Sequence, residues 1–484
     1  ANNDVTSTNA NVELNTGGSI TTNSIVNALN NVIANANGNI ATKGDVTAET
    51  GKAVLNSKSG SVTMQNIAGN SEVDIDAAYD ITADGNLTSN NGDITLYAGG
   101  NITTNGKTKA RNNVTANAKG DINANNDVTS TNANVELNTG GRITTNSIVN
   151  AFNNVIANAN GNIATNGDVT AETGKAALNS KSGSVTMQNV AGNSEVDIDA
   201  AQDITADGNL TSNNGDITLD AGGNITTNGN VNAYDHLIAN AKGDIAINGE
   251  ITTENGSAVL KSNSGSITTN GNVNVYDNVI ANAAGDIATN GDITTENGSV
   301  ILNSSAGSVT MQNVTANNEV DIDAAYDITA DGNLTSNNGD ITLYAGGNIT
   351  TNGKTKARNN VTANAKGDIN ANNDVTSTNA NVELNTGGRI TTNSIVNAFN
   401  NVIANANGNI ATNGDVTAET GKAALNSKSG SVTMQNVAGN SEVDIDAAQD
   451  ITADGNLTSN NGDITLDAGG NITTNGKTKA RNNV

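Results

Sequence analysis

The amino-acid sequence predicts an all-β fold: a right-handed parallel β-helix, or solenoid, with three short strands per coil of about 20 residues and roughly 24 coils. Three observations lead to this prediction. The sequence repeats at two scales, its apolar and polar residues alternate with a period of two, and its composition suits only a thin core. No linker or charge block interrupts the series, so residues 1–484 are expected to form a single continuous domain.

The larger repeat is marked by the string ANNDVTSTNANVELNTGG, which begins at Ala1, Ala124 and Ala371, with a diverged copy near Ile247. These positions define four super-repeats, of which the last is truncated: residues 1–123, 124–246, 247–370 and 371–484. Each complete super-repeat divides into six units of about 20 residues. A period of this length indicates a solenoid rather than a series of globular domains.

Within one unit the apolar residues recur with a period of two, as in strands that bury one face. In the unit that begins at Asp80, the residues expected to point inward are Ile81, Ala83, Leu87, Ser89, Ile94, Leu96 and Ala98. Those expected to point outward are Thr82, Asp84, Asn86, Thr88, Asp93, Thr95 and Tyr97. Turn formers such as the Gly99-Gly100 pair divide the unit into three strands. Hairpins would give no reason for three strands in the same order in every unit.

Stacked units of three strands predict a coil in which each strand pairs with its equivalent in the next coil, about 4.8 Å away. Right-handed winding follows from the crossover rule for parallel strands. The chain has no Pro, no Cys and only 2% aromatic residues, but 35% of it is hydrophobic and regularly spaced, which argues against disorder. A narrow interior accommodates Val, Ile, Leu, Ala and inward Thr or Ser, and stacked Asn residues at the turns are expected to form amide ladders.

The net charge of the chain argues against two classes of partner, nucleic acids and anionic membranes. There are 22 Lys and Arg against 48 Asp and Glu, which gives a net charge of -26. Such a chain repels phosphate backbones, so no nucleic-acid partner is expected, and anionic membrane surfaces are disfavoured for the same reason. No apolar run approaches the roughly 18 residues that a membrane span requires, so no membrane span is expected.

The phrases GNITTNGNVNA, from Gly223, and GDITLDAGGNITTNG, from Gly215, are typical of a known family. They resemble the filamentous haemagglutinin repeats of two-partner-secreted bacterial adhesins, and the resemblance extends over essentially the whole chain. It implies a right-handed β-helical stalk at a bacterial cell surface or outside the cell, used for adhesion or cell–cell contact. The sequence departs from the family in showing no family-type secretion domain and no distinct tip domain.

Two functions from different classes follow. The leading hypothesis is a structural extracellular fibre or adhesin stalk, not an enzyme, with no cofactor. Its partners would be copies of itself, joined end to end or laterally, and glycans or proteins of a host or neighbouring cell. The alternative is a ligand-binding β-helix for a carbohydrate, a divalent cation or an ice surface. Catalysis is not expected, because no long loop is present to frame a cleft and the near-identical copies leave no unique site.

The acidic stretch EVDIDAAYDITADG supplies the candidate metal ligands. Glu72, Asp74 and Asp76 alternate outward, and Asp93 is expected beside them on the next coil. Calcium takes several oxygen ligands of this kind, so these four residues are candidate calcium ligands. Alternatively, they form a solvated acidic face, with Lys52 stacked on Glu72.

The segment GKTKARNN brings three cations, Lys107, Lys109 and Arg111, into one strand region. Together with the outward Tyr97 they are candidate contacts between neighbouring rods. The alternative is local compensation, in which Lys107 stacks on Asp127 of the next coil. The single histidine, His236, is expected on the surface beside Asp216.

Outward threonines form a partial row on the first strand of successive units. A regular threonine face orders water on ice-binding solenoids, but Ala41 and Asn123 interrupt this row. An ice-binding role is therefore disfavoured.

Overall fold

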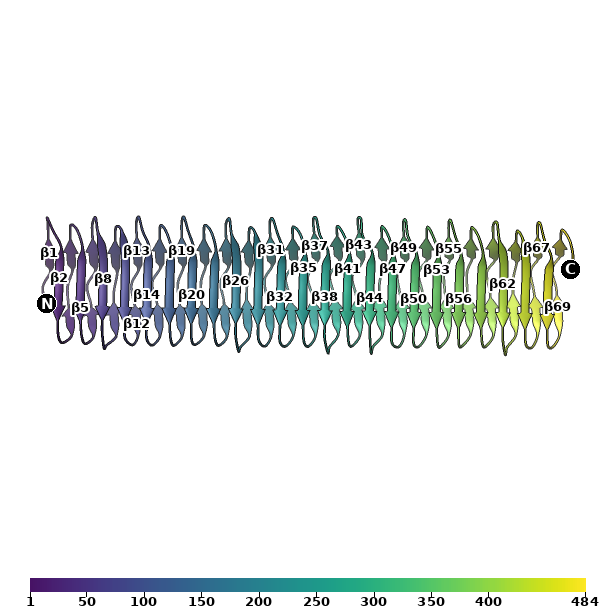
Figure 1. The fold of residues 1–484 in the computed structure, drawn as a ribbon, viewed down its shortest axis with the longest axis horizontal. Helices are drawn as coiled ribbons and strands as arrows, with labels where there is room; N and C mark the ends of the chain where they lie inside the picture. The colour runs from purple at the N-terminus through teal and green to yellow at the C-terminus, as the bar shows by residue number, and fades with distance from the viewer. The chain divides into compact units, whose positions relative to one another are not determined.

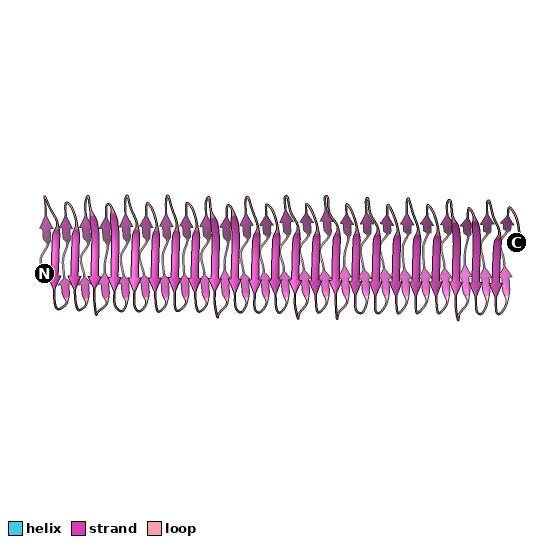
Figure 2. Cartoon of the chain, viewed as in Figure 1, coloured by secondary structure: helices cyan, strands magenta, loops and turns pink.

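The computed structural model describes residues 1–484 as two compact units. From here on, unit 1 means residues 1–241 and unit 2 means residues 242–484, and the 20-residue repeats are called coils. Each unit consists of strands joined by short turns, and neither contains a helix (Figure 2). Unit 1 runs from β1 (Val5–Ser7) to β35 (Leu237–Ala241), and unit 2 runs from β36 (Ile245–Ile247) to β70 (Thr478–Ala480). The structure therefore has no helix with the length and apolar character of a membrane span.

One coil is built from three strands in a fixed order. β12 (Ile81–Ala83) and β13 (Leu87–Ser89) are short, and β14 (Ile94–Ala98) is longer. Strands at these three places form three faces within each unit, called here the first, second and long faces. Figure 1 shows the strands of successive coils side by side.

Every strand pairs in parallel with its equivalent one coil away. β12 pairs with β15 (Ile102–Thr104), β13 with β16 (Thr108–Ala110), and β14 with β17 (Val114–Ala118). The predicted fold class, an all-β parallel solenoid with three strands per coil, is confirmed. Coils average about 21 residues and number about 23 over the two units. The sequence estimate of roughly 24 includes partial coils. Right-handed winding and a single continuous domain stay predictions.

The long face carries most of the outward polar side chains discussed below. In unit 1 its strands include β8 (Lys52–Ser57), β11 (Glu72–Ala77), β14, β17, β20 (Val135–Thr139), β23 (Val155–Ala159), β26 (Lys175–Ser180), β29 (Glu195–Ala200) and β32 (Ile217–Ala221). In unit 2 the corresponding strands include β47 (Val320–Ala324), β50 (Ile341–Ala345), β53 (Val361–Ala365), β56 (Val382–Thr386), β59 (Val402–Ala406) and β62 (Lys422–Ser427).

The core of each unit is a stack of inward side chains. Ile81, Leu87 and Ile94 are fully buried, one from each face of the same coil. The predicted alternation in this coil is confirmed, because all seven residues expected to point inward are buried. Burying an Ile or Leu side chain contributes about 1.5–3 kcal/mol, so the thin core gains stability from many repeated small contributions.

Asparagine side chains form a ladder along the exposed corner after the first face. In unit 1, Asn105 donates to Asp84 at 2.8 Å, and Asn125, Asn146 and Asn166 each donate to the residue one coil before at 2.7 Å. Unit 2 repeats the arrangement from Asp331, with the same donor and acceptor atoms, through Asn352, Asn372, Asn393 and Asn413. The expected amide ladders are thus present in both units.

Glycine is required at the corners by the closeness of neighbouring coils. No residue of the chain has a positive φ, so backbone conformation does not explain the glycines. A Cβ at Gly99 would lie 2.1 Å from the carbonyl oxygen of Ala78, whereas a Cβ at Gly17 would meet nothing closer than 4.0 Å. The Gly99 corner therefore excludes a side chain because a backbone atom of the adjacent coil occupies the space.

We expect Gly99→Ala to destabilise its corner by about 2 kcal/mol, because relieving the clash requires two coils to move apart. Amide hydrogen exchange around Ala78 and Gly99 would measure the local opening free energy. Gly17→Ala is the matched control and should leave exchange at its own corner nearly unchanged. Equal protection losses in the two variants would contradict this account of the corner.

Inward threonines differ in whether their hydroxyl groups have partners. Thr145 is 1% exposed, and its Oγ1 makes no hydrogen bond. Thr139 also ends a strand, but its Oγ1 donates to the carbonyl of Gly120 and accepts from the Gly141 N–H at 3.1 Å. A buried hydroxyl without a partner loses its hydration and gains nothing in return.

Replacing these two threonines with valine should therefore shift stability in opposite directions. Thr145→Val keeps the shape and removes the unpaired hydroxyl, so we expect a gain of about 1 kcal/mol. Thr139→Val removes two hydrogen bonds and should cost about 1–2 kcal/mol. Guanidinium titration with local hydrogen exchange would measure both, and a loss of stability in Thr145→Val would disprove the assignment.

Candidate functional site

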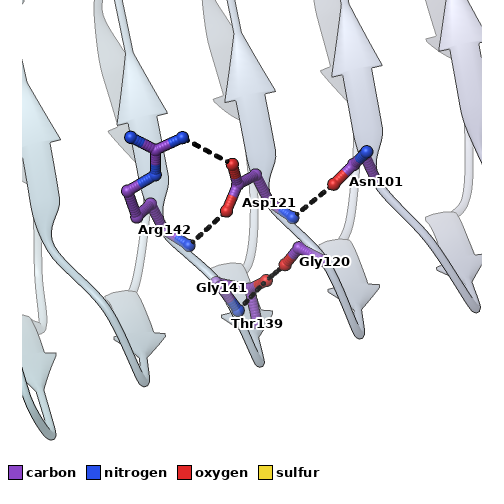
Figure 3. A network of polar contacts seen from close by, with 6 residues as sticks. All are labelled: Asn101, Gly120, Asp121, Thr139, Gly141 and Arg142. Carbon is purple, nitrogen blue, oxygen red and sulfur yellow. Dashed lines mark hydrogen bonds and ion pairs between the residues drawn. The ribbon is translucent and has the colours of Figure 1, made fainter.

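Side chains at the corner after the long face bridge successive coils (Figure 3). Asn101 accepts from the Asp121 N–H at 2.7 Å, and Asp121 in turn accepts from the Arg142 N–H at 2.8 Å. The Arg142 guanidinium also pairs with Asp121 at 2.9 Å. These two bonds, first that of the Arg142 backbone and then that of its side chain, lower the pKa of Asp121. This carboxylate therefore stabilises the fold above its unfolded pKa, and the contribution is lost as the pH falls below that value.

The acidic stretch lies along β11 as the sequence predicted. Glu72 and Asp74 are half-buried, Asp76 is exposed, and Glu72 forms an ion pair with Lys52 of the preceding coil. The predicted stacking of Lys52 on Glu72 is confirmed. Burial, followed by repulsion from Glu72 and Asp76, raises the pKa of Asp74.

The candidate calcium ligands are not gathered into a metal site. Asp93 lies one coil further along, where its carbonyl accepts from the Val73 N–H at 3.0 Å. No group of three or more acidic or histidine side chains in the structure is arranged to hold a metal ion. Calcium binding by Glu72, Asp74, Asp76 and Asp93 stays a prediction.

Like charges also stack further along the long face, although Asp197 itself pairs with Lys175 of the preceding coil at 4.0 Å. Asp199 of β29 is in register with Asp220 of β32, and Asp197 lies two residues away on the same strand. Asp220 accepts a hydrogen bond from Asn240 at 2.8 Å. Burial, then repulsion from Asp220 and Asp197, raises the pKa of Asp199. Ionised Asp199 is thus less stable in the folded chain than in water.

The cationic segment divides into a paired and an exposed part. Lys107 lies 3.1 Å from Asp127 of the next coil, which confirms the predicted stacking. Arg111 donates to the side chain of Asn91 at 3.2 Å, while Lys109 is exposed on the second face. Lys109 and Arg111 border a hollow of about 400 Å³, and unit 2 has a similar hollow at Lys356 and Arg358. Contact between rods through Lys107, Lys109, Arg111 and Tyr97 stays a prediction.

His236 is exposed and lies beside Asp216, where its backbone N–H donates to the Asp216 carboxylate at 2.8 Å. On the first face, the threonine row is interrupted as expected, since Thr21 pairs in register with Ala41 and Thr103 with Asn123.

An open groove of unit 1 follows the corner after the long face. It has a volume of about 1050 Å³ and extends from β11 to β26. Its wall on the long face is lined by Asp76, Tyr97, Asn117, Asn138, Asn158 and Asn179. Its corner side is lined by Ala78, Gly99, Lys119, Gly140, Asn160 and Lys181.

Unit 2 contains a corresponding groove of about 1080 Å³, lined by Asp323, Tyr344, Asn364, Asn385, Asn405 and Lys428 among others. Tyr97 was predicted from the sequence, but the asparagines and lysines around it were not. The aligned strings VTANAKG, VELNTGG and VIANANG contain the signal, because each places Asn at the same outward position. No long loop frames either groove, and the corner side of the unit 1 groove includes small residues such as Gly99 and Gly140.

Comparison with protein-family models, with curated proteins and with solved structures finds no match to this chain. The resemblance to filamentous haemagglutinin repeats therefore rests on the sequence phrases alone. The structure supports the broader description, a β-helical repeat protein.

We expect Asp199→Asn to stabilise the chain at pH 7 by about 0.5 kcal/mol, the scale of an exposed charge pair. The folded-state pKa of Asp199 is raised, so its ionisation opposes folding above that pKa and has no effect below the unfolded value. The gain should therefore disappear near pH 3, in thermal unfolding followed by circular dichroism.

Asp127→Asn is the control with the opposite sign. Hydrogen bonds from Ser147, then Lys107, lower the pKa of Asp127, so this variant should lose stability at pH 7. A gain from Asp199→Asn that persisted at pH 3 would show that charge repulsion is not its cause.

Proposed function

We propose that this chain is the rod of an extracellular structural fibre or adhesin stalk at a bacterial surface. One observation carries the proposal: within each unit, every coil is hydrogen-bonded to the next along all three faces. A repetitive solenoid of this kind fits a fibre or stalk, because nearest-neighbour ladders extend in one dimension without a new fold. Each unit, with about 12 coils at about 4.8 Å, extends about 55 Å along its axis.

The proposed role is mechanical and involves no catalysis and no cofactor. Load applied to the stalk is shared by backbone ladders, while the repeated surface offers many weak and equivalent contacts to a partner. The proposed partners are further copies of the chain, joined end to end or laterally, and proteins or glycans on a host or neighbouring cell. The acidic surface supports a role away from nucleic acids, since a net charge of -26 repels polyanions.

Immunogold electron microscopy of intact cells from the native source tests the proposal. Antibodies against the purified chain should label filamentous material outside the cell envelope, and treating intact cells with protease should remove the label. A cytoplasmic marker protein, probed on the same cells, is the control for envelope integrity. Label confined to the cytoplasm would rule out the extracellular fibre.

A further inference from the structure

The two grooves at the corner after the long face have linings that suit a particular class of ligand. They occupy equivalent places in units 1 and 2, and each combines an exposed tyrosine with a row of asparagines. In unit 1, Tyr97 of β14 is in register with Asp76 on one side and Asn117 on the other. The aromatic ring therefore stands near one end of the polar row.

The asparagine row is a hydrogen-bonded ladder with open ends. Asn138 donates to Asn117 at 3.1 Å, and Asn158 donates to Asn138 at 2.9 Å. Glu136 accepts a further bond from Asn138 at 2.9 Å, which holds the middle amide in place. The amide nitrogen of Asn117 and the amide oxygen of Asn158 have no protein partner in the structure. The ladder thus presents a fixed donor at one end and a fixed acceptor at the other.

This combination suits a sugar better than the other common ligand classes. A hydroxyl group both donates and accepts, so it matches carboxamides that offer both functions. The Tyr97 ring is 48% exposed and gives a flat apolar surface on which the C–H face of a pyranose ring can pack. Lys119 and Lys181 on the corner side add exposed ammonium donors.

Other polymers fit the groove less well. A peptide that adds a strand needs an unpaired sheet edge, but the strands bordering the groove already pair on both sides. Polyanions are disfavoured by the net charge of the chain and by Asp76 at the tyrosine end. A neutral polymer with hydroxyl groups at regular intervals meets neither obstacle.

The periodicity of the wall indicates an extended ligand. Consecutive coils place one polar side chain about every 4.8 Å along the axis. An extended pyranose chain presents its hydroxyl groups at a similar repeat, one sugar after another. We infer that each groove binds an extended neutral glycan, with one sugar packed on Tyr97 or Tyr344 and the following sugars along the asparagine ladder.

This inference rests on the proposed adhesive role only for the source of the glycan, because binding itself is measured on the purified chain. The sequence provides a variant that the fold already accepts. Asp220 occupies in ITLDAGG the place that Tyr97 occupies in ITLYAGG, and its strand pairs with both neighbours in the same register. Tyr97→Asp and Tyr344→Asp thus remove the ring at positions where aspartate is compatible with the coil.

Isothermal titration calorimetry with three neutral hexasaccharides, cellohexaose, maltohexaose and chitohexaose, tests the inference. At least one should bind the full chain at two equivalent sites. Tyr97→Asp should leave one site, and the double variant with Tyr344→Asp should weaken binding at least tenfold. Tyr79→Gln is the control, since Gln202 occupies the equivalent place in the next super-repeat and Tyr79 lies outside the groove lining.

The inference is overturned if none of the three hexasaccharides binds, or if binding survives the double variant. It is also overturned if an uncharged hexapeptide competes equally well for the same sites. Circular dichroism of each variant verifies that the fold is retained. These outcomes are separate from the location of the chain, so a negative titration would leave the extracellular fibre standing.

Discussion

In-register stacking of equivalent residues is the constraint on which the rest of this structure depends. Each parallel ladder places a residue about one strand spacing from its counterpart in the next coil. Every side chain therefore lies beside the side chain at the same position of the neighbouring coil, whether the two are identical or different. Favourable stacks accumulate, as in the amide ladder from Asp84 to Asn166. Unfavourable stacks accumulate too, and the aspartates at 199 and 220 show the cost. The same spacing requires Gly99 to lack a side chain.

The stacking rule explains how much of the fold was predictable. A period of two identifies the inward residues of each strand, so the burial of Ile81 was predictable. Alignment of the 20-residue repeats gives the register between coils, so the pairs Lys52–Glu72 and Lys107–Asp127 were predictable too. These predictions succeeded because each depends only on the place that a residue occupies within its own coil. A repeat sequence contains this information in its own copies.

Features that depend on actual distances between atoms were not predictable. Thr139 and Thr145 both end a strand, yet only the Thr139 hydroxyl reaches a carbonyl group. The groove beside Tyr97 extends over several consecutive coils and is therefore a property of the assembled surface. The absence of long loops predicted no cleft, whereas a groove follows this corner without any long loop.

The super-repeat has a genetic consequence. Each complete super-repeat contains a whole number of coils, and residues 124–229 are identical to residues 371–476. Unequal recombination between such copies would delete or insert complete turns of the solenoid. Every newly apposed strand would meet the partner that it already has elsewhere in the chain, so the junction would need no adaptation. The gene can therefore change the length of its product in fixed steps, while each step preserves the columns of amides, carboxylates and aliphatic side chains.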